Sequence, residues 1–594
     1  MMGEHARSGS RPDLQSEPKP EFTVGAKMDT EGTIRHIRHR LAALQDQRRL
    51  WEGHWKQLSS HFLPRSSRFL SDSGRSGARS NPRLYDSTGI IAARTLAAGL
   101  QGGLTSPVAP WFRLNLSQKT AVNDDVTVNW LASTQEKMVN TINQSNFYEQ
   151  IHLLYAELAV MGTGCMLMEE DHEQVVRFKT LTAGEYYIDT DAQGRVDTLY
   201  MRQSLTARQI IDQWGDGAPE PLHKAARKSD GTLYGIVHVI EPAVDCEHGA
   251  VRSDRPYISY FLLEYGDGVL LEVGGYYEFP ALCPRWDVTG GECYGRSPAM
   301  DALPDCRMLQ RIRRDTLQAL SREVRPPLNV TSGAVSVVPD VSPDAINYIP
   351  TGGQSEAVKP LYQVRSNLQA AEVTIQGCRE QIKEAFFNDL FLMLSRIQGP
   401  MTATEVMERN AEKMLMVGPV LDRLRSEVFQ PLVERVYRLM ERAGYLDYYP
   451  YEKPEQKMQV EFVSVLAQAQ KSAGLSSVSQ LLGFLGELTA IDGEVVDKLD
   501  VDKVFDEVAG MLGVQPGLLR GRESVALRRQ ERSRAMQEAG ETAQLKEELG
   551  LVGDMASLAT QVDAGALLEN MGDHNILEAG TLIPEGLTLE NLEG

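Results

Sequence analysis

The residues with the clearest potential for chemistry are three glycines between two apolar runs, Gly99, Gly102 and Gly103. A glycine-rich turn holds nucleotide phosphates when Gly-Lys-Ser or Gly-Lys-Thr follows, because the backbone amides, the lysine and the hydroxyl share the phosphates and Mg²⁺. No such tripeptide occurs anywhere in the chain. The glycines therefore do not predict a nucleotide site.

Other reactive patterns are also missing from the sequence. His172-Glu173 does not continue into H-E-x-x-H, and the chain has no G-x-S-x-G elbow. Its six cysteines include no C-x-x-C pair, so neither a zinc site nor a disulfide framework is indicated. They are Cys165, Cys246, Cys283, Cys293, Cys306 and Cys378. We expect no catalytic, cofactor-binding or metal-ligating residues, and hence a protein that is not an enzyme.

Arginines between Arg520 and Arg534 could contact phosphates, but Glu523 and Glu531 interrupt them, which favours a solvated helix face. The net charge of −20 argues against a free-standing DNA-binding protein. Half of this charge lies in residues 547–594, which contain ten acidic residues and no Lys or Arg. Such a tail is typical of a solubilising segment.

With 594 residues the chain is too long for one hydrophobic core, so several domains are expected. It has neither an apolar run long enough to span a bilayer nor an apolar signal core. We therefore expect a protein made in the cytoplasm with no membrane partner.

The elements that organise the chain lie between Cys293 and Glu405. A helix is predicted from Asp301 to Arg325 and ends at Pro326-Pro327, because proline cannot donate a backbone amide. A β-rich insert follows to about Val364, and a second amphipathic run covers Leu368–Leu394. The helical spacing is carried by Leu309, Ile312, Thr316, Leu320 and Val324 in the first run, and by Ala371, Ile375, Cys378, Ile382 and Phe386 in the second. Together they predict a helical hairpin that carries a folded tip.

The rest of the chain reads as a platform. A helix is expected over 34–62, with Ile37, Leu41, Leu44, Leu50 and Trp51 on its apolar side. Asp86 or Ser87 can cap a second helix, and Trp111 begins a strand. Helices are expected over 126–162 and 208–214, and strands within 164–203 and 234–278. Residues 31–292 therefore look like an α+β platform.

A third long helix is predicted from Thr402 to Gly444. It opens with a capping box formed by Thr402 and Glu405. Gly418-Pro419 and Pro431 should kink or interrupt it. Residues 458–538 are expected to be helical again.

Several of these stretches resemble one family. The residues are Arg83-Leu-Tyr-Asp-Ser-Thr-Gly89, Ala97-Ala-Gly-Leu-Gln-Gly-Gly-Leu-Thr-Ser-Pro107, Trp111-Phe-Arg-Leu114, Tyr294-Gly-Arg-Ser-Pro298, Pro326-Pro-Leu-Asn-Val330 and Met401-Thr-Ala-Thr-Glu-Val406. In this order they look like the head-to-tail connector (portal) proteins of short-tailed, podovirus-type bacteriophages, over roughly residues 35–445. The first block is the most specific.

The resemblance implies an α+β, mainly helical subunit of the portal type, with wing, stem helices, clip and crown, which forms a closed ring. The implied division is a disordered arm 1–30, wing 31–298, stem helix 299–325, clip 326–365, second stem helix 366–392, tunnel loop 393–401, a long wing/crown helix 402–444, a helical crown 445–540 and an acidic C-terminal tail 541–594.

The same resemblance implies a homo-oligomeric ring, a dodecamer, at one vertex of the capsid in the virion. Double-stranded DNA would pass through its channel during packaging and ejection, without sequence specificity. The implied protein partners are the terminase large subunit, a tail adaptor or tail proteins, and the major capsid and scaffolding proteins.

Three sets of site residues follow as hypotheses. The tunnel-loop set facing the DNA channel is Arg396, Gln398, Gly399 and Pro400. The stem set is Arg307, Arg311, Arg314 and Arg322. The clip set facing a partner is Val335, Val337, Ile346 and Tyr348. A mixed or acidic wall suits a conduit, because a strongly basic one would hold the DNA phosphates.

Two other readings remain open. The chain could be another non-enzymatic virion protein such as a tail adaptor, or a packaging-associated hydrolase. The hydrolase would need a phosphate loop or a metal-binding carboxylate cluster, and no clear version of either is found in the sequence.

Overall fold

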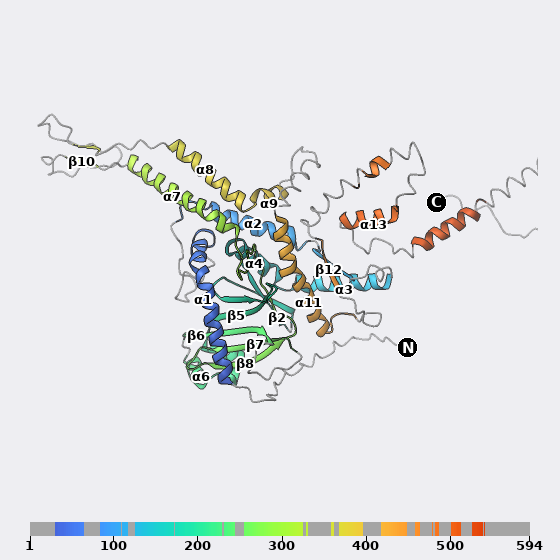
Figure 1. Cartoon of the computed structure of the whole chain (residues 1–594), viewed down its shortest axis with the longest axis horizontal. Helices are drawn as coiled ribbons and strands as arrows, with labels where there is room; N and C mark the ends of the chain where they lie inside the picture. Colours follow the sequence, from blue (N-terminus) through green and yellow to red (C-terminus); the bar gives the residue numbers. More distant parts are fainter. Residues whose placement is uncertain are drawn as a thin grey trace, which may run out of the picture. The chain divides into compact units, whose positions relative to one another are not determined.

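The structure is a computed structural model. It describes residues 30–64, 84–108, 110–116, 125–171, 173–228, 231–243, 255–324, 328–330, 358–360, 368–395, 417–447, 458–463, 478, 481–485, 500–512, 525–538 and 540. The chain divides into two units, Met1–Leu518 and Leu519–Gly594. Within the described residues the fold is α+β and mainly helical, as expected (Figure 1).

A five-stranded antiparallel sheet of order β4-β5-β6-β7-β8 organises one part of the first unit. Its strands are β4 (Tyr186–Thr190), β5 (Val196–Thr206), β6 (Leu233–Pro242), β7 (Tyr257–Leu263) and β8 (Val269–Tyr276). Side chains of β6 alternate between the two faces of the sheet. Val237 and Val239 pack with helix α1 (Thr30–Phe62), whereas Ile236 packs with the short helices α5 (Ala207–Trp214) and α6 (Glu220–Arg227).

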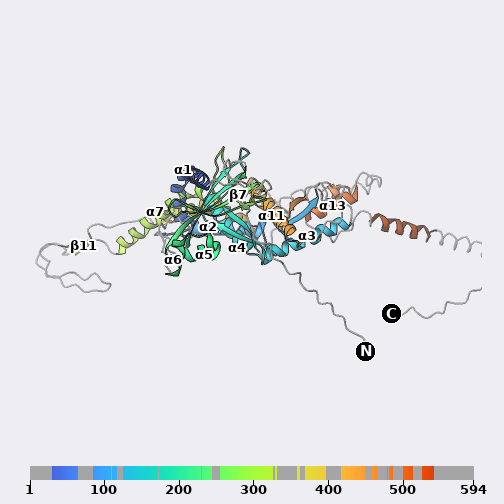
Figure 2. The ribbon, with the colours of Figure 1, turned by 90° about the horizontal axis from the view of Figure 1, so that it is seen from below.

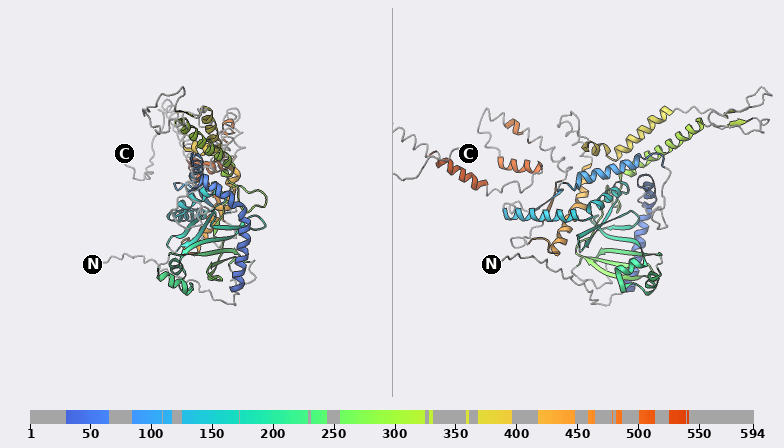
Figure 3. Two further views of the ribbon diagram at one scale, coloured as in Figure 1. Left: turned by 90° about the vertical axis from the view of Figure 1, so that its left-hand side faces the viewer. Right: turned by 180° about the vertical axis from the view of Figure 1, so that it is seen from behind.

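Helix α1 therefore covers one face of this sheet, along which it lies in Figures 1 and 3. The pair α5 and α6, with the 3-10 turn η3 (Gly215–Gly217) between them, forms a small cluster of its own, visible in Figure 2. Leu50, which the sequence places on the apolar side of α1, is 86% exposed. That expectation was wrong, because beyond Leu44 the buried stripe continues through Arg48, Trp55 and Leu58.

The main core joins α1 to a second, three-stranded sheet and to several helices. This sheet has the order β3-β2-β9, with β2 (Cys165–Asp171), β3 (Val175–Leu181) and β9 (Ala281–Leu282). The packed helices are α2 (Thr88–Leu104), α3 (Asp125–Gln144) and α4 (Phe147–Met161). The predicted helical stretch 126–162 is thus divided into α3 and α4.

A two-stranded sheet links distant parts of the chain. Strand β1 (Phe112–Leu116) pairs with β12 (Met458–Phe462), with Phe112 opposite Phe462. The expectation that 458–538 is helical throughout was therefore wrong at its start. Alternation in Met-Gln-Val-Glu-Phe favours a strand, and β1 supplies the hydrogen-bonding partner. Helix α13 (Val501–Leu512) follows later in the first unit.

The helical hairpin is present. Helix α7 (Pro298–Val324) ends just before the Pro326-Pro327 pair and packs along α8 (Leu368–Ala385), and the two lie side by side in Figures 1 and 3. Beyond their outer ends, β10 (Leu328–Val330) pairs with β11 (Val358–Pro360). These strands pair within one chain at the base of the predicted insert, and residues 331–357 lie outside the described residues.

The second run is not one helix. It breaks after α8, where Phe387 adopts a φ of 53°, and resumes as α9 (Asn388–Ser395). A positive φ is energetically unfavourable for a non-glycine residue such as Phe387. The residue before it, Phe386, is fully buried at this turn. The single helical run predicted for Leu368–Leu394 therefore consists of two helices that meet at this turn.

The third predicted helix is described from Val417 onward, and Thr402 and Glu405 lie outside the described residues. The interruption expected near Pro431 is present, whereas Gly418-Pro419 lies within uninterrupted helix over the described residues 417–424. A π-helical turn, η6 (Arg425–Phe429), precedes α11 (Gln430–Arg442). The interruption lies directly before Pro431, which has no amide to continue the α-helical ladder. Gly444, with a φ of 71°, follows the end of α11.

Two glycines fix how the start of α7 meets the end of α4. Gly162 has a φ of 78°, and a Cβ on it would lie 2.4 Å from the carbonyl oxygen of Gly295. The amide of Gly295 donates to Oγ1 of Thr163 at 2.8 Å. These backbones therefore approach too closely for any side chain, which ties the root of the hairpin to the platform.

Among the described helices, none is both long enough and apolar enough to cross a membrane.

We predict that Gly162→Ala lowers the stability of the protein by about 3 kcal/mol or more, because it adds a backbone clash to left-handed strain. Gly194→Ala is the matched control, since Gly194 also has a φ of 78° but no atom lies within 4 Å of its Cβ position. The control should cost only about 1 kcal/mol. Thermal unfolding of both variants checks this, and equal melting temperatures would contradict it.

Candidate functional site at the base of the helical hairpin

A buried carboxylate joins both hairpin helices to the platform. Asp86 lies just before α2, and only 4% of its side chain is exposed. Its Oδ2 accepts from Arg379 of α8, with Nη2 at 2.8 Å and Nε at 3.2 Å. Arg313 of α7 forms an ion pair with the same oxygen, with its Nε at 3.5 Å. One acidic side chain therefore holds a guanidinium from each helix, and we call Asp86, Arg313 and Arg379 the Asp86 clamp.

The backbone around Asp86 is held by α7 as well. Oε1 of Gln310 accepts from the amides of Tyr85 and Asp86 at 2.7 and 3.1 Å, and its Nε2 donates to the Asp86 carbonyl at 2.6 Å. The other Asp86 oxygen, Oδ1, accepts from the Thr88 amide at 2.9 Å. Asp86 rather than Ser87 thus satisfies the first turn of α2, since Ser87 makes no side-chain cap bond.

The charges in and around the Asp86 clamp nearly balance. Arg313 also lies 3.8 Å from Glu372 of α8, so two guanidiniums face two carboxylates. Burial raises the pKa of Asp86, but the hydrogen bonds from Thr88 and Arg379 outweigh it and hold that pKa below its ordinary value. Asp86 is therefore ionised at neutral pH and neutralises charge that the hairpin would otherwise bury.

The second half of α2 explains one glycine of the Gly99–Gly103 cluster. A Cβ on Gly99 would lie 2.2 Å from Cγ of Phe391, a buried residue of α9. Glycine is thus required for α9 to pack on α2. Because α9 ends at Ser395, this contact fixes the chain immediately before residues 396–416, which lie outside the described residues.

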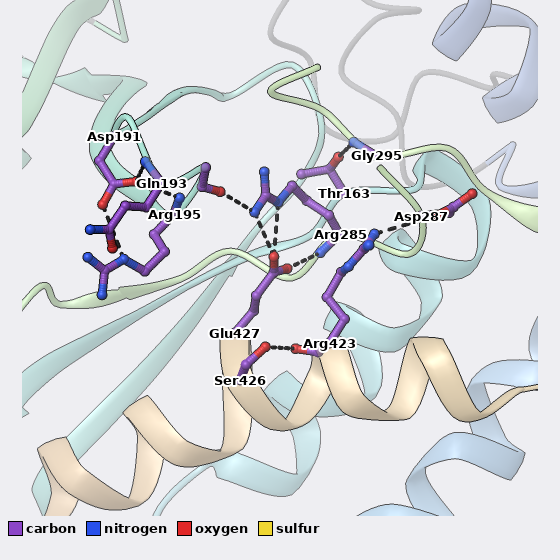
Figure 4. Close-up of polar contacts among 11 residues, drawn as sticks. Thr163, Asp191, Gln193, Arg195, Arg285, Asp287, Gly295, Arg423, Ser426 and Glu427 are labelled. Atoms are coloured by element: carbon purple, nitrogen blue, oxygen red, sulfur yellow. Dashed lines mark hydrogen bonds and ion pairs between the residues drawn. The ribbon is translucent and has the colours of Figure 1, made fainter. Parts of the chain in front are cut away.

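The chain that follows residues 396–416 is held to the platform by a second group of contacts, drawn in Figure 4. Glu427 of the π-helical turn accepts from Arg285 through two side-chain bonds, at 2.6 and 3.2 Å, and from its amide at 2.8 Å. Arg285 is 7% exposed at its side chain and also donates to the Gly194 carbonyl at 2.7 Å. Arg423 approaches Asp287 at 3.7 Å, as Figure 4 shows.

Farther along, α11 is held by a buried arginine. Arg435 donates to the carbonyl and side chain of Glu278 and to the carbonyl of Met168. Arg442 adds a bond to Glu278 at 2.9 Å. Both flanks of residues 396–416 are therefore anchored to the platform, one through Phe391 and the other through Glu427 and α11.

The predicted stem arginines lie on α7, where all four are exposed. Arg307 donates to Gln57 of α1, and Arg311 and Arg314 share Asp315, at 3.8 and 3.0 Å. Such exposed pairs hold their partners weakly. None of these four arginines is part of the Asp86 clamp.

The tunnel-loop and clip sets cannot be placed. Arg396, Gln398, Gly399 and Pro400 lie outside the described residues, as do Val335, Val337, Ile346 and Tyr348.

Sequence reasoning missed the residues that make the clamp. It identified Asp86 only as a possible cap and did not single out Arg313 or Arg379. A usable signal exists, because Arg313 follows Leu309 and Arg379 follows Ile375 by four positions, so each arginine lies on the buried side of its helix. An arginine on an apolar stripe needs an acidic partner, but the sequence does not say which one.

Within the described residues, no group of three or more His, Cys, Asp or Glu side chains could hold a metal ion.

Known proteins resemble this chain over most of its length. The family model described as bacteriophage head to tail connecting protein matches residues 35–519. The probable portal protein of Bordetella phage BPP-1 is 36% identical over 527 residues, covering 88% of this chain and 95% of that protein. The portal protein of Salmonella phage epsilon15 is 35% identical over 505 residues, covering 84% and 91%. The portal protein of Pseudomonas phage phiKMV is 23% identical over 402 residues, covering 64% and 74%.

We predict that Asp86→Asn destabilises the base of the hairpin by about 2 kcal/mol, because both guanidiniums lose their charged acceptor. Hydrogen exchange in α7 and α8 should accelerate. The same contribution should be complete above about pH 4, near the pKa of an unfolded aspartate, and should be lost as pH falls through the lower folded pKa.

Asp315→Asn is the matched control, since Asp315 lies on α7 but is exposed and pairs only at the surface. It should change stability by no more than about 0.5 kcal/mol. If both variants exchange at the wild-type rate, the clamp does not hold the hairpin.

Proposed function

Because the chain belongs to the family of bacteriophage head to tail connecting proteins and has a portal function in the virion, we propose that it forms a closed ring at one capsid vertex. Double-stranded DNA is packaged and ejected through the centre of this ring. The observation that carries the proposal is similarity to two portal proteins at 35–36% identity over most of the chain. The ring is proposed to be a dodecamer.

Apolar side chains on the outer half of the hairpin support lateral assembly. Leu317, Leu320 and Val324 of α7 are 53%, 42% and 73% exposed, and Val373 of α8 is 71% exposed. Leu317, Leu320 and Val324 continue the surface of α7 away from the fully covered Leu309. Val373 lies on the face of α8 opposite the fully covered Ile375. Helices with an unburied apolar stripe gain stability when a neighbour covers it. A closed ring supplies that neighbour through two different faces of each subunit.

The wall of the channel is proposed to be mixed in charge. The exposed arginines 307, 311, 314 and 322 offer phosphate contacts, but Asp315 lies between two of them and the chain is acidic overall. Weak and partly neutralised contacts let DNA slide, because each fully neutralised phosphate strengthens binding. In the tunnel loop, which includes Gln398, Gly399-Pro400 is proposed to let the loop flex against the DNA while Arg396 touches it.

We assign the wing to 31–298, the stem to 299–325 and 366–392, the clip to 326–365, the tunnel loop to 393–401 and the crown to 445–540. The clip, with Val335, Val337, Ile346 and Tyr348, is proposed to bind the terminase large subunit during packaging and the tail adaptor afterwards. As a head–tail connector the ring also meets the major capsid and scaffolding proteins.

We predict that Leu320→Glu prevents ring closure, lowering the ring fraction roughly tenfold or more, because each interface would bury an unpaired carboxylate. Leu233→Glu on β6 is the control, since Leu233 is 46% exposed and undergoes the same change away from the hairpin. Negative-stain images and mass measurements of the full chain report the ring. Unchanged rings in the Leu320 variant would reject the hairpin as the interface.

In a packaging reaction, Arg396→Ala and a shortened 396–401 loop should reduce the DNA retained in the capsid, whereas Arg208→Ala should not. Arg208 lies on α5 and 85% of its side chain is exposed.

Removing residues 331–357 should abolish binding of the terminase large subunit while rings persist. Full DNA retention, or unchanged terminase binding, would refute the corresponding role.

A further inference from the structure

Two buried cysteines of the three-stranded sheet have no role in the proposed function. Cys165 is the first residue of β2, Cys283 directly follows β9, and both are free thiols. Their sulfur atoms are 3.6 Å apart. Because the two residues are 118 positions apart in the chain, no local spacing in the sequence indicates this pair.

The two thiols lie directly opposite each other on neighbouring antiparallel strands. Met166 of β2 faces Leu282 of β9, and one step outward along both strands places Cys165 opposite Cys283. Side chains at opposite positions of adjacent antiparallel strands lie on the same face of the sheet. The contact between the sulfur atoms therefore follows from the register of the strands.

The backbone spacing at this position suits a disulfide. The amide of Gly164 donates to the carbonyl of Pro284 at 2.9 Å, so the cysteines beside them occupy a non-hydrogen-bonded pair of positions. Opposite Cα atoms are about 4.5 Å apart at such positions, which is within the range that a disulfide spans. The sulfur atoms can therefore approach to about 2 Å by rotation of the side chains, without a shift of either strand.

The pair lies where the five-stranded sheet joins the main core. The chain between the two cysteines contains β3 and all of β4–β8, together with α5 and α6. Strands β2 and β9 are thus the entry to this long segment and the exit from it. Just beyond Cys283, Arg285 holds Glu427. A bond between the cysteines would therefore fasten both ends of the segment at its base.

We propose that Cys165 and Cys283 form an oxidation site, at which hydrogen peroxide converts the two thiols into a disulfide that fastens β2 to β9. Cys283 is 4% exposed, whereas Cys165 is fully buried, so Cys283 reacts first. Its sulfur attacks one peroxide oxygen and breaks the O–O bond, which releases water and leaves a sulfenic acid. The sulfur of Cys165 then displaces the hydroxyl group as a second water. Two thiols and one hydrogen peroxide thus give one disulfide and two waters.

Burial makes this reaction slow. It raises the pKa of the Cys165 thiol, so that little of it is thiolate at neutral pH. Disulfides are rare in the cytosol and persist on virions. The pair therefore stays reduced while the protein is made, and it is oxidised once a particle has left its host cell. The reaction lies within one subunit and does not depend on ring formation.

The first experiment maps the bond in the full chain. The folded protein is treated with hydrogen peroxide, and the remaining thiols are then alkylated in denaturant. Trypsin places the two cysteines on different peptides, 138–177 and 253–285. We expect these peptides to be linked in most molecules, with a mass two hydrogens below their sum, and to separate on reduction.

Two variants and one internal marker make the result decisive. Cys283→Ala should leave Cys165 as an alkylated thiol. Cys293→Ala is the matched control and should form the link as the wild type does, because the buried Cys293 thiol donates to the Ile188 carbonyl at 3.3 Å. Sulfoxide at Met536, which is 72% exposed, shows that peroxide has acted. If Met536 is oxidised while the two cysteines are recovered on separate peptides, the proposal is wrong.

The second measurement is thermal unfolding of the same samples. Linking residues 118 positions apart restricts the unfolded chain, so the oxidised protein should melt roughly 4 °C higher than the reduced protein. A phosphine reductant should reverse the rise, and peroxide should not produce it in Cys283→Ala. A linked peptide without a rise in melting temperature would contradict the claim that the bond fastens the strands.

Discussion

The hairpin depends on a single buried acid. Asp86 lies just before α2 in the sequence. Its carboxylate nevertheless pairs with Arg313 and Arg379, which are 66 residues apart on two different helices. Removing water from the Asp86 carboxylate is unfavourable unless charged partners satisfy it. The clamp therefore makes the position of α7 and α8 conditional on the turn at 84–88, and it gives the most specific of the resembling blocks a physical role.

The platform holds the helical hairpin and the chain around residues 396–416 in place through close contacts. Gly162 and Gly295 bring two backbones into contact at the root of α7. Phe391 on Gly99, and Glu427 on Arg285, fix the chain on both flanks of residues 396–416. These contacts lie among largely buried residues, whereas the predicted stem arginines are exposed and weakly paired. The hairpin therefore has a fixed root, and the four predicted stem arginines lie at its surface.

Charge is also divided along the chain. Arginine is used inside the first unit as a buried cross-link, as in Arg285 and Arg435, and in the second unit as an exposed helix face. Half of the net negative charge lies in the last 48 residues, which contain no Lys or Arg. A conduit for a polyanion benefits from this separation, because long-range repulsion and short-range contact can then act at different places.

By itself the sequence determined the hairpin, its exit at Pro326, the strands of the platform, the interruption near Pro431 and the resemblance to portal proteins, because these follow from local periodicity, proline chemistry and contiguous motifs. Only the tertiary structure decided which acid meets Arg313 and Arg379, that Met458–Phe462 pairs with β1, and that Phe387 breaks the second run. Such pairings join residues tens to hundreds of positions apart. A one-dimensional pattern shows that a partner is needed, and burial in three dimensions selects it.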